Sequence, residues 1–214
     1  MRHRGQMRLF AAVRPPEHVL GHLDLALRAV QERQPHGPVA GVRWAPPENW
    51  HLTAAFYGDV SDGMADELAD ALRVGAAGIP RFELRLRGAG VFAHRTLWIG
   101  ASGEVDGMRA VIAAAGAAGE SVGARPDDRV RSRPHLTVGR IGQATDGRGW
   151  SRRHPVPATS QESAVVHALS LYDGPAWQVD EVVLTRSEPG AGRGGGPLYT
   201  PLEHLPLGAA PREG

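Results

Sequence analysis

The sequence predicts an α+β fold made of two related lobes, and three observations support this prediction. Strand and helix patterns alternate along the chain and give way to further strands towards its end. The tripeptide His-Leu-Thr occurs twice, at residues 51–53 and 135–137, each time in an apolar stretch with strand character. Hydrophobic residues make up 42% of the chain and charged residues 22%, as in globular domains.

The first quarter of the chain begins with a short apolar strand at residues 7–13. Two consecutive prolines then open a helix over residues 15–34, because proline is tolerated in a first turn and apolar residues follow at three- and four-residue spacings. A brief extended piece at 42–44 leads to a strand at 50–57. We expect Gly58 to end that strand.

The middle of the chain continues with a helix over residues 62–77, whose apolar residues fall on one face. Residues 82–92 and 96–101 have the pattern of two neighbouring strands joined by a turn. The alanine-rich stretch 104–118 is predicted to be helical, with an interruption at Gly116.

The last third of the chain is mostly strand and loop. Its elements are predicted as a strand at 134–141, a Gly-, Arg- and Pro-rich loop at 142–160, a short helix at 163–171, a strand at 177–186, a mobile glycine-rich loop at 189–197 and a strand at 199–207. The whole is expected to form one bilobal domain over residues 1–207, followed by a flexible tail at 208–214.

Composition excludes several classes of function. The chain has no cysteine, which rules out disulfides, thiolate zinc sites and cysteine nucleophiles. No apolar run approaches the ~20 residues that span a bilayer, and the apolar stretch after the basic N-terminus is too short for a secretory signal. We therefore expect a cytoplasmic protein without a membrane partner. Separately, we expect a monomer. A net charge of +1 argues against a protein that wraps long nucleic acid.

The repeated His-Leu-Thr tripeptide suggests acid–base chemistry. Side chains alternate across a strand, so His51 and Thr53 share one face while Leu52 points into the core, and the same holds for His135 and Thr137. If the two lobes face each other, two imidazoles and two hydroxyls converge on one pocket. One imidazole can then remove a proton while the other delivers one, and the hydroxyls can bind phosphate oxygens.

Arg140 follows His135 by five residues, which places it on the opposite strand face by strict alternation. A bulge or strand end at Gly139 would turn it towards the pocket. There its guanidinium would stabilise the charge that develops on a phosphate in the transition state.

The residues around both tripeptides resemble a known family. RWAPPENWHLT at 43–53, with FYGDV at 56–60, resembles the first signature of the bacterial RNA 2′,3′-cyclic phosphodiesterases, formerly called the 2′-5′ RNA ligase family and part of the 2H phosphoesterases. PHLTVGR at 134–140 resembles the second signature. The opening strand, the middle hairpin around GVF and LWIG, and the closing strands with VVLTRS and YTPL are also similar, so the resemblance covers about residues 7–207.

This resemblance implies a bilobal, pseudo-two-fold 2H phosphoesterase fold, in which two antiparallel sheets flank a central cleft and helices lie outside. It implies hydrolysis of RNA or nucleotide 2′,3′-cyclic phosphates to 2′-phosphates, with no metal and no cofactor. By position, His51 corresponds to the family's proton donor and His135 to its proton acceptor. The substrate-binding residues we expect are Thr53, Thr137, Arg140, Phe10 and Arg43.

Other functions remain open at this point. The same fold could serve a 2′-5′ RNA ligase or a phosphodiesterase for another small cyclic nucleotide. A non-catalytic module that binds RNA ends is a different class, but binding alone would not need a matched acid and base. A metallohydrolase is a third class: His18 and His22 have the i, i+4 spacing of metal ligands, but no third ligand is identifiable and we expect surface histidines.

Overall fold

The computed structural model describes residues 6–32, 42–124, 133–141 and 165–208. Within these ranges, nine antiparallel strands form one sheet in the order β7-β4-β5-β6-β3-β1-β8-β9, with β2 paired to β6. The strands are β1 (Gln6–Val13), β2 (Val42–Trp44), β3 (Leu52–Ser61), β4 (Phe82–Phe92), β5 (Thr96–Gly103), β6 (His135–Ile141), β7 (Asp173–Val179), β8 (Glu181–Glu188) and β9 (Leu198–Pro206). The helices are α1 (Glu17–Glu32), α2 (Asp62–Ala77) and α3 (Val105–Ser121), with single turns η1 (Pro47–Asn49) and η2 (Arg193–Gly195).

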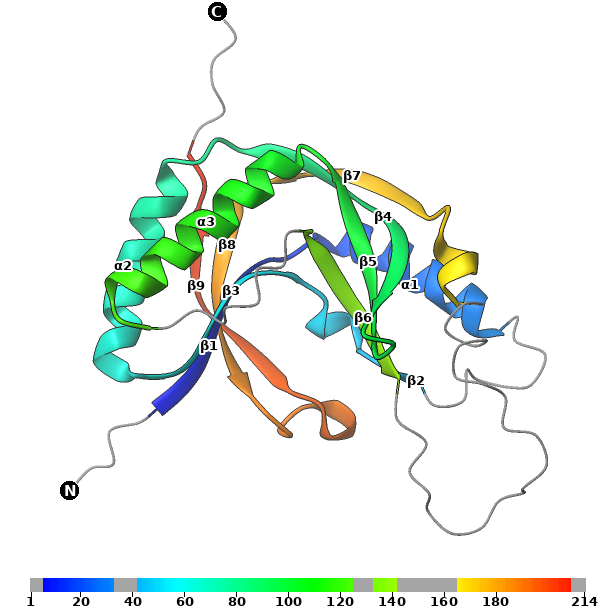
Figure 1. Cartoon of the computed structure of the whole chain (residues 1–214), viewed down its shortest axis with the longest axis horizontal. Helices are drawn as coiled ribbons and strands as arrows, with labels where there is room; N and C mark the ends of the chain where they lie inside the picture. The colour runs from blue at the N-terminus through cyan, green and yellow to red at the C-terminus, as the bar shows by residue number, and fades with distance from the viewer. Residues whose placement is uncertain (1–5, 33–41, 125–132, 142–164, 209–214) are drawn as a thin grey trace, which may run out of the picture.

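The sheet consists of two halves, β3-β1-β8-β9 and β7-β4-β5-β6, and the short strand β2 adds to the second half at β6. The two halves meet at β3 and β6, where Leu52 pairs with Leu136. Helices α2 and α3 pack against the first half, and α1 packs against β7 of the second half (Figure 1). The predicted α+β fold with two lobes is therefore confirmed, and the two sheets expected from the sequence are the two halves of one sheet, joined at β3 and β6.

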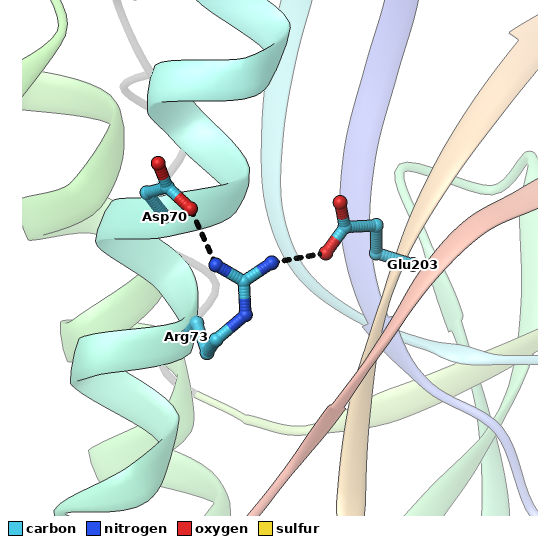
Figure 2. A network of polar contacts seen from close by, with 3 residues as sticks. All are labelled: Asp70, Arg73 and Glu203. Atoms are coloured by element: carbon cyan, nitrogen blue, oxygen red, sulfur yellow. Dashed lines mark hydrogen bonds and ion pairs between the residues drawn. The ribbon is translucent and has the colours of Figure 1, made fainter.

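Helix α2 shows how the local sequence sets the elements of the first half. The Ser61 hydroxyl caps the helix by accepting a hydrogen bond from the Met64 amide. Leu68 and Leu72 lie one turn apart and are buried against the sheet. On the outer side, Arg73 bonds to Asp70 within the helix and donates to Glu203 of β9 at 2.6 Å (Figure 2). This exposed network adds little stability but joins α2 to the edge strand.

Three sequence predictions about element boundaries are wrong. Gly58 does not end β3: it adopts a φ of +70°, which glycine tolerates, and pairing continues to Ser61. Gly116 does not interrupt α3, because one glycine weakens a helix without breaking it. The expected strand 177–186 is two strands separated at Asp180, and β7 pairs with β4 while β8 pairs with β1 in the other half. A continuous apolar run cannot reveal such a change of partner.

Some predictions fall outside the described residues. These are the loop at 142–160, the first residues of the helix at 163–171, whose described part is helical at 165–169, and the tail after residue 208. Gly208 itself is tied down, because its amide donates a hydrogen bond to the Ile79 carbonyl at 2.9 Å.

Candidate active site

Each His-Leu-Thr strand carries a β-bulge at the residue that follows its threonine. In β3 the pairing with β1 skips Ala54, and in β6 the pairing with β5 skips Val138. The extra residue at Val138 shifts the alternation of side chains along β6 by one position. Arg140 therefore lies on the same face of the sheet as Thr137, as the pairing of β6 with β5 shows. The expected bulge therefore exists, one residue before Gly139.

A pocket of about 900 Å³ opens on this face of the sheet. Of the residues predicted from sequence, those that line it are Arg43, His51, Thr53, Thr137 and Arg140. Its walls also include the turn before His51, the side of α1 and the glycine-rich segment around η2. The volume lies towards the upper end of the range for small-molecule sites, about 300–1,000 Å³.

His135 and Phe10 lie behind the pocket surface. His135 is 7% exposed and Phe10 is 4% exposed, and neither belongs to the residues that line the pocket. The Phe10 ring instead contacts the His51 imidazole, with 4.8 Å between ring centroids. The structure thus gives Phe10 little surface to offer a substrate, and its contact is with the histidine.

The two histidines are held in the same way. His51 Nδ1 lies 2.8 Å from the Asn49 carbonyl, and His135 Nδ1 lies 3.0 Å from the Arg133 carbonyl. In both cases the carbonyl belongs to the residue two positions earlier. Because a carbonyl oxygen can only accept, each Nδ1 carries the proton. In a neutral ring this tautomer leaves the lone pair on Nε2, so Nε2 is the ring atom that takes part in acid–base chemistry.

Aromatic rings surround both imidazoles. His51 contacts Phe10 and, edge to face, Tyr199 of β9 at 5.3 Å between centroids. His135 contacts Phe92 at 4.8 Å and Trp98 at 6.2 Å, and these two rings stack on each other. Tyr199 and Phe92 are site residues that were not predicted from the sequence. No local pattern could have identified them, because each residue reaches its histidine from another strand.

Burial changes the protonation of His51. Removal of the ring from water lowers its pKa from 6.5 to about 4; the hydrogen bond to Asn49 opposes this shift, while the charges of Arg14 and His135 add to it. Burial therefore favours the neutral form of the His51 imidazole at neutral pH.

Arginines supply the positive charge of the pocket. Arg43 of β2 is paired with Arg140 of β6, so the two guanidinium groups start from the same face of the sheet. Within the described residues neither forms an ion pair, whereas the other two pocket arginines do: Arg28 with Asp24 at 2.7 Å and Arg193 with Glu48 at 3.5 Å. Arg43 and Arg140 are thus available for an anion.

The remaining candidate residues have structural roles. His22 Nδ1 lies 3.1 Å from the Tyr172 hydroxyl, and the described residues contain no group of three His, Asp or Glu side chains that could hold a metal ion. Tyr57 is buried and its hydroxyl donates to the Ala115 carbonyl.

In the described part of the chain, no helix has the length and apolar character needed to cross a bilayer.

Known proteins resemble this chain in sequence and in fold. The model of the LigT-like phosphoesterase family matches residues 20–98. A curated relative from Methanothermobacter thermautotrophicus, named RNA 2′,3′-cyclic phosphodiesterase, is 32% identical over 169 residues, which cover 77% of this chain and 82% of the relative. The chain belongs to the LigT-like phosphoesterase family. The predicted membership and the predicted enzyme class, a phosphoesterase, are confirmed.

Two further matches span nearly the whole of this LigT-like phosphoesterase. A Thermus thermophilus relative, also named RNA 2′,3′-cyclic phosphodiesterase, is 29% identical over 210 residues, covering 94% of this chain and 90% of the relative. The crystal structure of TT0787 from Thermus thermophilus covers 95% of this chain and 99% of its own, with a TM-score of 0.67 and 27% identity. The fold is also that of apo LigT from E. coli, with a TM-score of 0.66, 23% identity, and coverage of 95% and 98%.

Proposed function

We propose that this phosphoesterase hydrolyses RNA or nucleotide 2′,3′-cyclic phosphates to 2′-phosphates, without a metal, with His51 and His135 as its acid–base pair. The observation that carries the proposal is the matched presentation of the two histidines, each fixed through Nδ1 to the carbonyl two residues earlier. Each lies two residues before a threonine that lines the pocket, and the same pocket is lined by Arg43 and Arg140, which form no ion pair with any described residue. The names of the relatives supply the substrate class.

In the proposed mechanism, His135 removes a proton from water, which attacks the cyclic phosphorus in line with the 3′ oxygen. The P–O3′ bond breaks, and His51 delivers a proton from Nε2 to the departing 3′ oxygen. Thr53, Thr137 and Arg140 hold the non-bridging oxygens, and Arg43 adds positive charge. Positioning together with an acid and a base can supply much of the rate acceleration.

The low pKa of His51 adds a requirement to this mechanism. A donor must be protonated, but burial keeps the free imidazole neutral at neutral pH. An anionic phosphate bound against the ring favours the imidazolium form and raises its pKa. Substrate binding and protonation of His51 are therefore coupled, so that the acid is generated where the phosphate is bound.

The test is hydrolysis of a dinucleotide with a terminal 2′,3′-cyclic phosphate in the presence of EDTA. We expect the wild type to give a 2′-phosphate, identified by chromatography. His51→Ala and His135→Ala should each lose at least about 100-fold in kcat, the lower range for a general acid or base. An inert wild type, or near-full activity in either variant, would contradict the proposal and make binding of RNA ends the function to test.

A further inference from the structure

Tyr199 is a pocket residue that the proposed mechanism does not use. It projects from β9, the outermost strand of the first half, and its ring lines the pocket next to His51. The ring edge packs against the His51 imidazole at an interplanar angle of 84° and against Phe10 at 69°, with 4.9 Å between the Phe10 and Tyr199 centroids. His51 is thus enclosed by two aromatic rings from two other strands.

The chain before Tyr199 is tied to the turn before His51. The Asn49 side chain donates a hydrogen bond to the Pro197 carbonyl at 3.1 Å, while the Asn49 carbonyl accepts from His51 Nδ1. The ion pair between Arg193 and Glu48 joins the same two segments. These bonds hold the segment before Tyr199 against the turn before His51. The position of Tyr199 relative to His51 is therefore fixed by backbone and side-chain bonds as well as by the contact between the two rings.

The Tyr199 hydroxyl is suited to bind an anion. Within the described residues it forms no hydrogen bond, although the residue is half-buried on the pocket wall. Burial raises the pKa of Tyr199, while the positive charges of Arg140 and Arg8 act in the opposite direction. The hydroxyl therefore stays protonated at neutral pH and can donate a hydrogen bond to an anion, and the charges of the two arginines favour an anion at this place.

We propose that Tyr199 is a further active-site residue: its ring holds the His51 imidazole against Phe10, and its hydroxyl donates a hydrogen bond to the phosphate bound beside Arg140. The second part rests on the proposed function, since it takes Arg140 to be the phosphate site. Tyr199 then acts on the reaction in two ways, by binding the anion and by positioning the proton donor.

Two substitutions separate these two roles without requiring turnover. Tyr199→Phe keeps the ring and removes the hydroxyl, so we expect about tenfold weaker binding of inorganic phosphate in calorimetry and an unchanged titration midpoint of His51. Tyr199→Leu removes the ring, so water reaches His51 and its midpoint should rise by about one pH unit or more. The midpoint is measured by NMR, with His51→Asn used to assign the signal.

Each role is judged by its own variant. Unchanged phosphate affinity in Tyr199→Phe would overturn the role of the hydroxyl, and an unchanged His51 midpoint in Tyr199→Leu would overturn the role of the ring. Tyr172→Phe is the matched control, because that hydroxyl contacts His22 away from the pocket, and it should bind phosphate as the wild type does. Neither readout depends on hydrolysis, so failure of the proposed function would be recognised separately.

Discussion

Leu52 and Leu136, the middle residues of the two His-Leu-Thr tripeptides, pair with each other where the two halves of the sheet meet. Both side chains are fully buried. Since side chains alternate along a strand, the leucines point into the core and leave the histidines and threonines on the opposite face. This pair therefore sets the register between the two motifs, and a slip of one residue would turn one motif away from the pocket.

Truncation of this junction is expected to destabilise the whole domain. Leu52→Ala should lower the free energy of unfolding by about 3 kcal/mol, because it removes buried methyl groups and leaves a cavity. Leu25→Ala is the matched control, since Leu25 is 70% exposed on α1 and should change stability by less than about 0.5 kcal/mol. Chemical denaturation measures both values, and equal effects of the two substitutions would contradict the importance of the junction.

Gly90 is expected to be irreplaceable beneath Trp98. A Cβ atom on Gly90 would lie 2.2 Å from Cζ2 of the Trp98 indole, which forms part of the wall around His135. Gly90→Ala should displace the indole, cost about 1–3 kcal/mol in stability and lower kcat.

Tryptophan fluorescence and a kinetic assay report the effect of Gly90→Ala. Gly116→Ala provides the comparison, because nothing lies within 4 Å of its added Cβ in α3 and alanine should stabilise the helix by about 0.5–1 kcal/mol. Wild-type kinetics in Gly90→Ala would show that Trp98 does not position His135.

Arg140 is expected to provide most of the phosphate affinity. Arg140→Gln should lower kcat/KM by about 10- to 100-fold, because a charge-assisted hydrogen bond to the phosphate is lost. Arg140→Lys should fall between this variant and the wild type, since lysine keeps the charge but not the planar fork. Steady-state kinetics should show no change for Arg109→Gln, whose exposed guanidinium pairs with Asp106 on α3. A full rescue by lysine would indicate that charge alone matters.

His51 is expected to make the protein sensitive to acid. Its pKa is about 4 in the folded protein and 6.5 when unfolded, so between these values the unfolded chain binds the extra proton. The free energy of unfolding is therefore highest above pH 6.5 and falls as the pH is lowered towards 4. The loss is at most about 3 kcal/mol, and it is smaller to the extent that water reaches the half-buried ring. Denaturation at several pH values should show a smaller loss of stability at acid pH in His51→Gln than in the wild type. If stability depends on pH in the same way in both proteins, the low pKa of His51 is contradicted.

Anion binding is expected to reverse this shift. Because a bound anion favours the imidazolium, the protein should take up a proton when it binds sulfate at pH 7, and sulfate itself does not titrate there. Calorimetry in buffers of different ionisation enthalpy measures the proton count, and His51→Asn should remove most of the uptake. Binding without proton uptake would favour the opposite assignment, with His51 as the base.

The sequence was sufficient for features that depend on local pattern. Periodicity located α2 within residues 62–77 and the hairpin of β4 and β5, because burial on one side imposes its spacing on the chain. The two His-Leu-Thr tripeptides indicated which side chains share a face, since alternation in a strand is a local property. Local pattern failed at Gly58 and Asp180, where pairing with distant strands decides whether a strand continues or changes partner.

By itself, then, the sequence determined the α+β class, the paired motifs and the type of chemistry they can perform. Only the tertiary structure decided that Leu52 meets Leu136, that Tyr199 and Phe92 enclose the two histidines, and that the Val138 bulge turns Arg140 to the pocket. It also decided the low pKa of His51, which no local motif reports. These properties depend on contact and loss of water between residues far apart in the chain, and such contacts exist only once the strands have paired.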